Sequence, residues 1–371
     1  MDTIVWLIIF LATCGVTIGC LLFLRHFESA RSRRMIFAAV AVLFFIPTVL
    51  LGLKRPLNAP IIFLHLSGYL LGALIVDGIL CLLARKREKK ADETRGRRLT
   101  RVATAALFGC LIYLSLGFVC ANWVRRTAYS FETEKNIANG SLRIAQISDV
   151  HLGTTMGSDR FAKLLRRVSG EDADILVITG DFVDEDTSRE DMLKACEAFS
   201  TECKIDRVFF IVGNHEELEG GEFTTEEVLS ELRKNHVTVL QDETILVDDD
   251  FYVVGRKDAS ESRKNMMELL KGVDKSKYIV VLDHQPNEFI REAAAGADLT
   301  LSGHTHGGYL FPLRFLSSYL NFLFGEAECI SGTGTKQNMN YIVSSGVGTW
   351  GCSFKTGTRS EYVIIDIKNN K

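Results

Sequence analysis

Four long apolar runs in the first third of the chain constrain its fold most strongly. They lie at about residues 4–24, 35–53, 59–84 and 99–124, and charged side chains are almost absent inside them. A helix of about 20 apolar residues spans the ~30 Å hydrocarbon core of a bilayer, whereas helices on a soluble core carry a polar face as well. The sequence therefore predicts a region of four transmembrane helices over residues 1–127.

The loops between these runs predict how the region crosses the membrane. Arg25–Arg34 and Arg85–Arg98 are rich in Lys and Arg, whereas the loop between the second and third runs carries only Lys54 and Arg55. The positive-inside rule places the two basic loops in the cytoplasm. We therefore expect a multi-pass protein of the cell membrane whose C-terminal part is extracytoplasmic. Asp77, inside the third run, is either a functional group or the partner of a charge within the bundle.

Composition changes after the fourth run. Residues 1–140 carry 18 Lys and Arg against 8 Asp and Glu, and residues 141–371 carry 25 against 38. An acidic domain repels the phosphates of nucleic acids, so no nucleic-acid partner is expected. A polar segment that ends in Asn-Gly-Ser predicts a linker over residues 128–141, followed by a domain over residues 142–371.

The C-terminal domain alternates short apolar runs with amphipathic stretches, which is the pattern of β-α-β units. Helices are expected at 159–170, 188–200 and 224–235. Five of these runs are expected to be core strands: Leu142–Ser148, Asp174–Gly180, Arg207–Gly213, Tyr278–Asp283 and Asp298–Gly303. Residues 243–258 have the pattern of two strands around an acidic turn, and further apolar runs lie near the C-terminus. Together these runs predict a second sheet packed on the first.

Nine cysteines do not predict a disulfide framework, because five of them lie in the apolar runs. The other four are Cys196, Cys203, Cys329 and Cys352, and none has C-x-x-C spacing. One or two bridges are compatible with an exported domain, and the sequence leaves their pairing open.

Each of the five core strands ends in polar residues that can bind a metal ion. These residues are Asp149, His151, Asp181, Asn214, His215, His284, His304 and His306. Each motif alone is weak, since Asp-x-His or Gly-Asp after a strand is common in turns. Together they indicate one site, because ligands collect at the carboxyl ends of the strands in an open α/β sheet.

The donor types indicate which metal would bind. They are carboxylate, amide oxygen and imidazole without a thiolate, which suits Mn, Fe or Zn. Seven ligands from this set of eight residues are too many for one tetrahedral zinc ion, whereas two ions that share a carboxylate would use all seven. In "GHTHGG", alternate residues of an extended segment point the same way, and Gly307 and Gly308 leave room for a substrate.

These motifs resemble the signature of the calcineurin-like metallophosphoesterase superfamily over about residues 142–370, and "VSSGVGTWG" is most similar to its membrane-associated bacterial branch. The resemblance implies a four-layer α/β/β/α double sandwich behind the transmembrane region. It implies a first metal held by Asp149, His151, Asp181 and His306, and a second held by Asp181, Asn214, His284 and His304. It assigns His215 a catalytic role as a donor to the phosphoryl oxygen or leaving group. Asp283 departs from the pattern, and it either points away from the site or orients a ligand.

The expected function is metal-dependent hydrolysis of a phosphodiester, phosphomonoester or pyrophosphate by metal-bound hydroxide, with manganese as the cation expected in vitro. The apolar segment Tyr309–Gly325 either covers the core between the sheets or enters the membrane interface, and the second reading favours a lipid-linked or cell-envelope substrate. The alternative is a membrane sensor or transport module whose phosphoesterase-like domain serves for binding or regulation. The sequence leaves the physiological substrate and the oligomeric state open.

Overall fold

The structure is a computed structural model. It describes residues 40–55, 57–84, 91–217, 222–311 and 327–370, together with parts of 11–22 and of 314–319. The chain forms two compact units. The first comprises Met1–Val119 with Gly351–Phe354, and the second comprises Cys120–Trp350 with Lys355–Lys371.

The first unit is helical, with a short π-helix η1 (Ala41–Phe45) followed by α3 (Ile46–Lys54), α4 (Asn58–Ala84) and α5 (Ala91–Asn122), which ends in the second unit. Two helical stretches are long and apolar enough to cross a bilayer, Asn58–Leu83 and Gly96–Asn122, each with a mean hydropathy of 2.1. They correspond to the third and fourth predicted spans.

The prediction of four spans is supported only in part. In the described part of the second predicted span, the apolar helix Val42–Leu53 is shorter than the ~20 residues that a crossing needs. The first predicted span, residues 4–24, falls largely outside the described residues. Among the residues that the structure describes, two candidate spans therefore remain.

The buried acid of α4 has a partner inside the first unit. Asp77 is 1% exposed, and the Arg98 Nε of α5 donates a hydrogen bond to its Oδ1 over 2.8 Å. The ring of His65 on α4 lies 5.5 Å from that of Tyr113 on α5. The sequence left two interpretations of Asp77 open, a functional group or the partner of a charge within the bundle. The structure favours the second, because a paired charge costs far less to bury than an isolated one.

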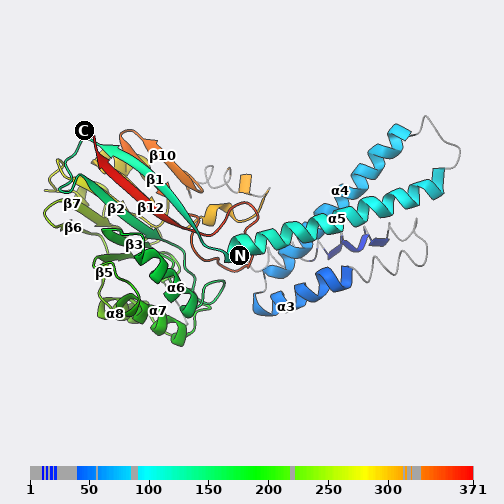
Figure 1. Cartoon of the computed structure of the whole chain (residues 1–371), viewed down its shortest axis with the longest axis horizontal. Helices are drawn as coiled ribbons and strands as arrows, with labels where there is room; N and C mark the ends of the chain where they lie inside the picture. Colours follow the sequence, from blue (N-terminus) through cyan, green and yellow to red (C-terminus); the bar gives the residue numbers. More distant parts are fainter. Residues whose placement is uncertain are drawn as a thin grey trace. The chain divides into compact units, whose positions relative to one another are not determined.

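The second unit contains two six-stranded sheets (Figure 1). The first sheet has the order β1 (Arg125–Thr133), β12 (Glu361–Asn369), β2 (Ser141–Ile147), β3 (Ile175–Thr179), β4 (Val208–Ile211) and β5 (Val237–Leu240). The second has the order β10 (Gly332–Lys336), β11 (Met339–Val343), β9 (Leu299–Ser302), β8 (Tyr278–Leu282), β7 (Phe251–Gly255) and β6 (Glu243–Val247). Strands β2 to β5 run parallel, as do β11, β9, β8 and β7, so each sheet has one edge at which carboxyl ends meet.

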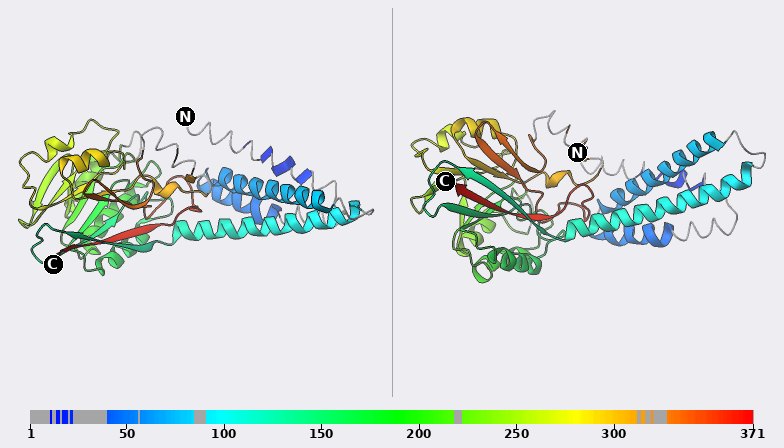
Figure 2. Two further views of the ribbon diagram at one scale, coloured as in Figure 1. Left: turned by 90° about the horizontal axis from the view of Figure 1, so that it is seen from above. Right: turned by 45° about the horizontal axis from the view of Figure 1, so that its top comes forward.

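Helices cover the outer faces of both sheets. An apolar cluster that includes Ile144, Phe209, Val280 and Leu301 fills the space between the sheets. The first sheet packs on its other face against α6 (Ser158–Ser169), α7 (Arg189–Thr201) and α8 (Thr225–Lys234), and the second against α9 (Met266–Leu269) and α10 (Phe289–Ala295). Figure 1 shows α6, α7 and α8 lying against the first sheet, and Figure 2 gives two further views of the same chain. The mixed α/β two-sheet architecture is thereby confirmed.

Local sequence accounts for the helices on the first sheet. In α6 the buried Phe161, Leu164, Leu165 and Val168 follow helical spacing, so one face of the helix is apolar. Ser188 caps α7 by accepting a hydrogen bond from the Asp191 amide. Thr224 opens α8 with a capping box. These are the three helices that the sequence predicts for this region.

The sheet membership of several strands differs from the prediction. Strands β8 and β9 belong to the second sheet, and β12 belongs to the first. The sequence did not predict this membership, because a strand buried on both faces has the same continuous apolar pattern in either sheet. Residues 128–133, predicted as linker, are part of β1, an edge strand that pairs with β12. Polar residues on its exposed side give β1 the composition of a linker.

No disulfide bond joins the four cysteines that follow residue 141. Cys196 and Cys352 are buried, and Cys203 and Cys329 are partly exposed. A fold with two sheets and three apolar clusters does not need cross-links to bury its core.

Candidate metal centre

Both sheets contribute to one cluster of polar side chains at the carboxyl ends of five strands. The first sheet supplies residues after β2, β3 and β4, and the second supplies residues after β8 and β9. In chain order these residues are Asp149 and His151, Asp181, Asn214 and His215, His284, and His304 with His306. The structure brings the predicted set together across 158 positions of sequence, from 149 to 306.

The first donor group consists of Asp149, His151, Asp181 and His306, and its ligand atoms all lie within 4.8 Å of one another. His151 Nε2 is 3.1 Å from His306 Nε2 and 3.5 Å from Asp181 Oδ2. His306 Nε2 is 3.6 Å from Asp149 Oδ1. All four residues are buried, so the group faces little competition from bulk water.

The second donor group consists of Asp181, His284 and His304, also within 4.8 Å, and it shares Asp181 with the first. His284 Nε2 lies 3.1 Å from Asp181 Oδ2. The side-chain oxygen of Asn214 lies 3.2 Å from His284 Nε2 and 2.9 Å from His304 Nδ1, so Asn214 joins this group. His304 and His306 therefore contribute to different groups.

The backbone around the donors is held in an uncommon conformation. Asp149, His151, Asp181, His304 and His306 all have positive φ angles, between 44° and 70°. Non-glycine residues adopt this left-handed region at a cost, and they cluster in it at functional sites. Gly213 and Gly303 permit the close approach of the loops, since a Cβ on either would overlap the side chain of Asp181 or Asp149.

The charges of the cluster depend on burial and on the neighbouring groups. Burial would raise the pKa of Asp181, but His284 and His151 hold it well below its usual value. Burial would lower the pKa of His151, yet Asp181 and Asp184 together raise it to about 10. Burial and the charge of His284 lower the pKa of His304 to about 4, so this imidazole is neutral, the form that binds metals.

The donor set fits divalent cations. Asp149 Oδ2 and His306 Nδ1 are buried and have no hydrogen-bond partner among the described residues. Two imidazole nitrogens that face each other at 3.1 Å cannot both donate, and a shared cation satisfies both. With carboxylate, amide and imidazole donors, the chemistry suits Mn, Fe or Zn.

His215 stands beside the donors and outside both groups. Its backbone amide donates to Asp181 Oδ1 over 3.0 Å, and its ring centroid is 4.9 Å from that of His151. His215 Nδ1 lies 3.4 Å from Glu185 Oε2. The contact with Glu185 engages Nδ1 and leaves Nε2 for a substrate, an arrangement suited to a proton donor.

Two acidic residues that the sequence did not single out support the donors. Glu216 is fully buried, and it accepts hydrogen bonds from the amides of Asp181, Phe182, Val183 and Gly213 over 2.5 to 3.1 Å. It thereby fastens the loop after β3 to the loop after β4. Its place next to His215 in "GNHEE" was the signal available in the sequence.

The second of these residues is Asp184. Its Oδ2 lies 3.3 Å from His151 Nδ1, and the Thr187 hydroxyl donates to its Oδ1 over 3.2 Å. A carboxylate behind a metal-binding histidine sets the tautomer and the direction of the ring. The sequence places Asp184 three residues after Asp181, but an acid in a turn is too common to indicate this role.

Replacing Asp184 by asparagine is therefore expected to weaken Mn²⁺ binding by about 10- to 100-fold, because His151 loses the carboxylate that orients it. The dissociation constant can be measured by titration calorimetry of the purified full chain. Asp159→Asn, an exposed change on α6, is the matched control. Equal Mn²⁺ affinity in Asp184→Asn and Asp159→Asn would contradict the positioning role.

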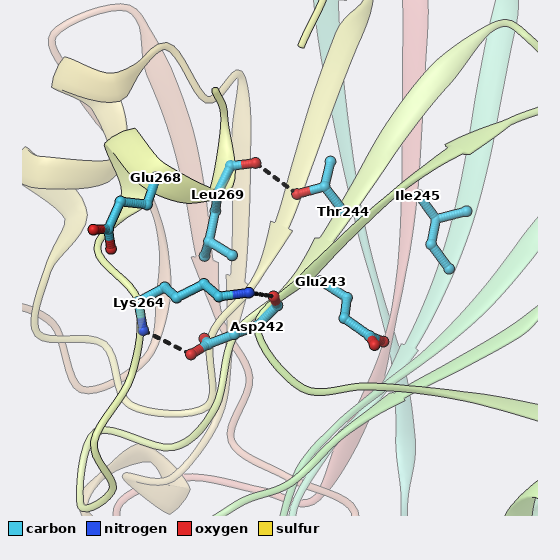
Figure 3. A pocket seen from close by; sticks show the side chains of 7 residues that line it. All are labelled: Asp242, Glu243, Thr244, Ile245, Lys264, Glu268 and Leu269. Carbon is cyan, nitrogen blue, oxygen red and sulfur yellow. Dashed lines mark hydrogen bonds between the residues drawn. The ribbon is translucent and has the colours of Figure 1, made fainter. Parts of the chain in front are cut away.

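Two neighbouring features do not belong to the cluster. Asp283, beside His284, pairs with Arg256 and Arg263 over 2.7 and 2.9 Å, so it faces an ion-pair network. A separate hollow of about 700 Å³ lies along β6, and Figure 3 shows the side chains that line it. Its lining residues are Asp242, Glu243, Thr244, Ile245, Lys264, Glu268 and Leu269, none of which is a predicted ligand. There the Lys264 amide donates a hydrogen bond to Asp242 Oδ2, and Lys264 Nζ donates one to the Asp242 carbonyl oxygen.

Comparisons with known proteins identify the family that this chain is similar to. Residues 142–308 match the family model for calcineurin-like phosphoesterases. An uncharacterized metallophosphoesterase of Aquifex aeolicus is 34% identical over 271 residues, which cover 71% of this chain and 97% of that protein. A Danio rerio transmembrane protein with a metallophosphoesterase domain is 29% identical over 242 residues, covering 61% of this chain and 53% of its own. A solved dimetal phosphatase from Danio rerio aligns with a TM-score of 0.35 and 13% identity, covering 55% of this chain and 87% of the other.

Proposed function

Because the chain belongs to the calcineurin-like metallophosphoesterase family, we propose that it hydrolyses phosphoesters with two divalent cations held on either side of Asp181. The observation that carries the proposal is the pair of donor groups that share this one carboxylate. The chain is thus a metal-dependent phosphoesterase, and the proposal adds the number of ions and the roles of the residues.

The proposed roles follow the two groups. Asp149, His151, Asp181 and His306 would hold one ion, and Asp181, Asn214, His284 and His304 the other. Divalent cations held by these residues would supply Lewis acidity for the phosphoryl oxygens and for the attacking water, and Mn²⁺ is the cation proposed for assays. His215, oriented by Glu185, donates a proton to the leaving oxygen.

We further propose a membrane-anchored enzyme that acts on a lipid-linked or cell-envelope phosphoester, with the catalytic domain on the extracytoplasmic side and four spans in all. The two candidate spans support an anchor. The Tyr309 ring lies 4.7 Å from that of His306, and the described aromatic residues that follow are exposed: Phe311, Phe315 and Tyr319. Exposed aromatic rings in the segment that follows Tyr309 suit contact with lipid.

The proposal can be tested with Phe315→Glu, because Phe315 is 64% exposed and can be changed without disturbing a core. In full-length protein assayed with Mn²⁺ in mixed micelles, kcat/KM for a long-chain lipid phosphodiester is expected to fall about tenfold or more, since burial of the ring in the micelle is lost. Turnover of soluble p-nitrophenyl phosphate and bis(p-nitrophenyl) phosphate is expected to stay unchanged.

Met267→Glu on α9, also at an exposed apolar side chain, is the matched control. Equal losses in the two variants would count against a lipid contact at Phe315. Activity towards nitrophenyl esters that survives complete chelation by EDTA would refute the proposed reaction itself. The sensor or transport alternative lacks comparable support, since Asp77, its ionisable candidate, is paired with Arg98.

A further inference from the structure

Three side chains form a rim beside His215: Glu185, Tyr309 and Trp350, here called the aromatic rim. The Trp350 ring centroid lies 5.2 Å from that of His215, and Trp350 Nε1 donates to Glu185 Oε1 over 3.1 Å. The Trp350 amide donates to the Tyr309 hydroxyl over 2.9 Å. These contacts join the loop before β12 to the loop after β9, and Trp350 lies directly beside His215.

The aromatic rim is accessible to solvent at Glu185 and, in part, at Trp350. Glu185 is 56% exposed at its side chain, and Trp350 is partly exposed. The hydrogen bond from His215 lowers the pKa of Glu185 to about 2, so the carboxylate is ionised at neutral pH. Arginines stack on Trp123 and Tyr362, whereas over Trp350 no lysine or arginine is found in the part of the chain that the structure describes.

Asp258 adds a second carboxylate close to the cluster, where its Oδ1 accepts a hydrogen bond from Gln285, the residue after His284. Asp258 is fully buried, its charge acts on His284 and His304, and its Oδ2 has no hydrogen-bond partner among the described side chains. Burial and the nearby Glu261 raise the pKa of Glu217, as expected for neighbouring carboxylates. The carboxylates of Glu185 and Asp258 disfavour a pyrophosphate or other polyanion and favour a substrate whose substituent is cationic.

We propose that the aromatic rim binds an ammonium group on the alcohol part of the substrate, as in a choline or ethanolamine phosphodiester. This inference rests on the phosphoester hydrolysis proposed above and names its substrate class. A cation placed over an aromatic face next to a carboxylate gains from both, and tryptophan is the best of the aromatic residues for this purpose. The ammonium alcohol is the leaving group, because the rim adjoins His215.

The reaction balances with water as the only co-reactant. Water adds to phosphorus, and the bond between phosphorus and the oxygen of the ammonium alcohol breaks. The leaving oxygen takes a proton from His215, which regains one from the attacking water. The products are the free ammonium alcohol and a phosphate monoester of the remaining substituent.

The test compares two soluble diesters that differ in one atom. Glycerophosphocholine carries a quaternary nitrogen, and its 3,3-dimethylbutyl analogue carries carbon in the same place. For the full chain in detergent with Mn²⁺, kcat/KM for release of glycerol phosphate is expected to be about tenfold higher for the choline ester. In Trp350→Leu and in Glu185→Gln this ratio is expected to fall towards one, and in Glu190→Gln, an exposed change on α7, to persist.

Each outcome separates the inference from the function on which it rests. The neutral analogue measures any general loss of turnover in a variant, so the ratio reports recognition of the charge alone. A wild-type ratio near one, or cleavage of neither diester, while bis(p-nitrophenyl) phosphate is hydrolysed, would overturn the inference and leave the function standing. A ratio that persists in both rim variants would overturn it too. Failure to hydrolyse any phosphoester with Mn²⁺ would overturn the proposed function.

Discussion

Replacing Asp181 by asparagine is expected to lower kcat by about 10³-fold or more while the domain stays folded. Asp181 Oδ2 lies 3.1 Å from His284 Nε2 and 3.5 Å from His151 Nε2, so its carboxylate serves both donor groups. An asparagine oxygen can still accept the hydrogen bond of the His215 amide, but it lacks the negative charge that two adjacent cations require.

Metal analysis and circular dichroism of the purified variant check this expectation. We expect fewer than two ions per chain with an unchanged spectrum. Asp366→Asn, which removes a partner of Arg143 on the surface of β12, is the matched control and should keep both ions and full turnover. Retention of wild-type kcat by Asp181→Asn would refute the two-ion arrangement.

Replacing His215 by glutamine is expected to lower kcat by about 10²- to 10⁴-fold with the metal content unchanged. His215 lies outside both donor groups, and its ring contacts His151 and Trp350. Glutamine can fill much of that space and donate a hydrogen bond, but it cannot release a proton to a leaving oxygen. Loss of kcat without loss of metal is the signature that separates a donor from a ligand.

The leaving group provides a second readout for His215. A substrate with p-nitrophenolate as leaving group needs little protonation, so the variant should lose less turnover on it than on an alkyl ester. His236→Gln, at an exposed histidine after α8, is the matched control. Equal losses on both substrates, or a drop in bound metal, would contradict the assigned role.

The sequence predicted local structure well where periodicity is strong. The runs at 142–148, 174–180 and 207–213 became β2, β3 and β4, and the three amphipathic stretches between 158 and 235 became α6 to α8. The position of polar residues directly after strands predicted that the donors would converge. This inference works because parallel strands deliver their carboxyl ends to the same edge, whatever their order in the sheet.

Long-range features were harder to predict. Strands β8 and β9 are continuous apolar runs, and such runs fit the middle of either sheet. Asp184 and Glu216 gain their roles only from neighbours 33 to 35 residues away, and local composition does not reveal such contacts. The hydrogen bond between Trp350 and Glu185 joins residues 165 positions apart, so the aromatic rim became visible only in the fold.

The division of the donors between two sheets links metal binding to the assembly of the domain. Asp149, His151, Asp181 and Asn214 follow strands of the first sheet, whereas His284, His304 and His306 follow strands of the second. Neither sheet alone completes a donor group, so cations bind tightly only once the inter-sheet core has closed. Metal binding and docking of the sheets are then thermodynamically linked. The free energy by which docking strengthens cation binding equals the free energy by which the bound cations stabilise the docked sheets. A substitution that creates a small cavity in the core around Ile144 and Val280 is therefore expected to weaken metal binding before it unfolds the protein.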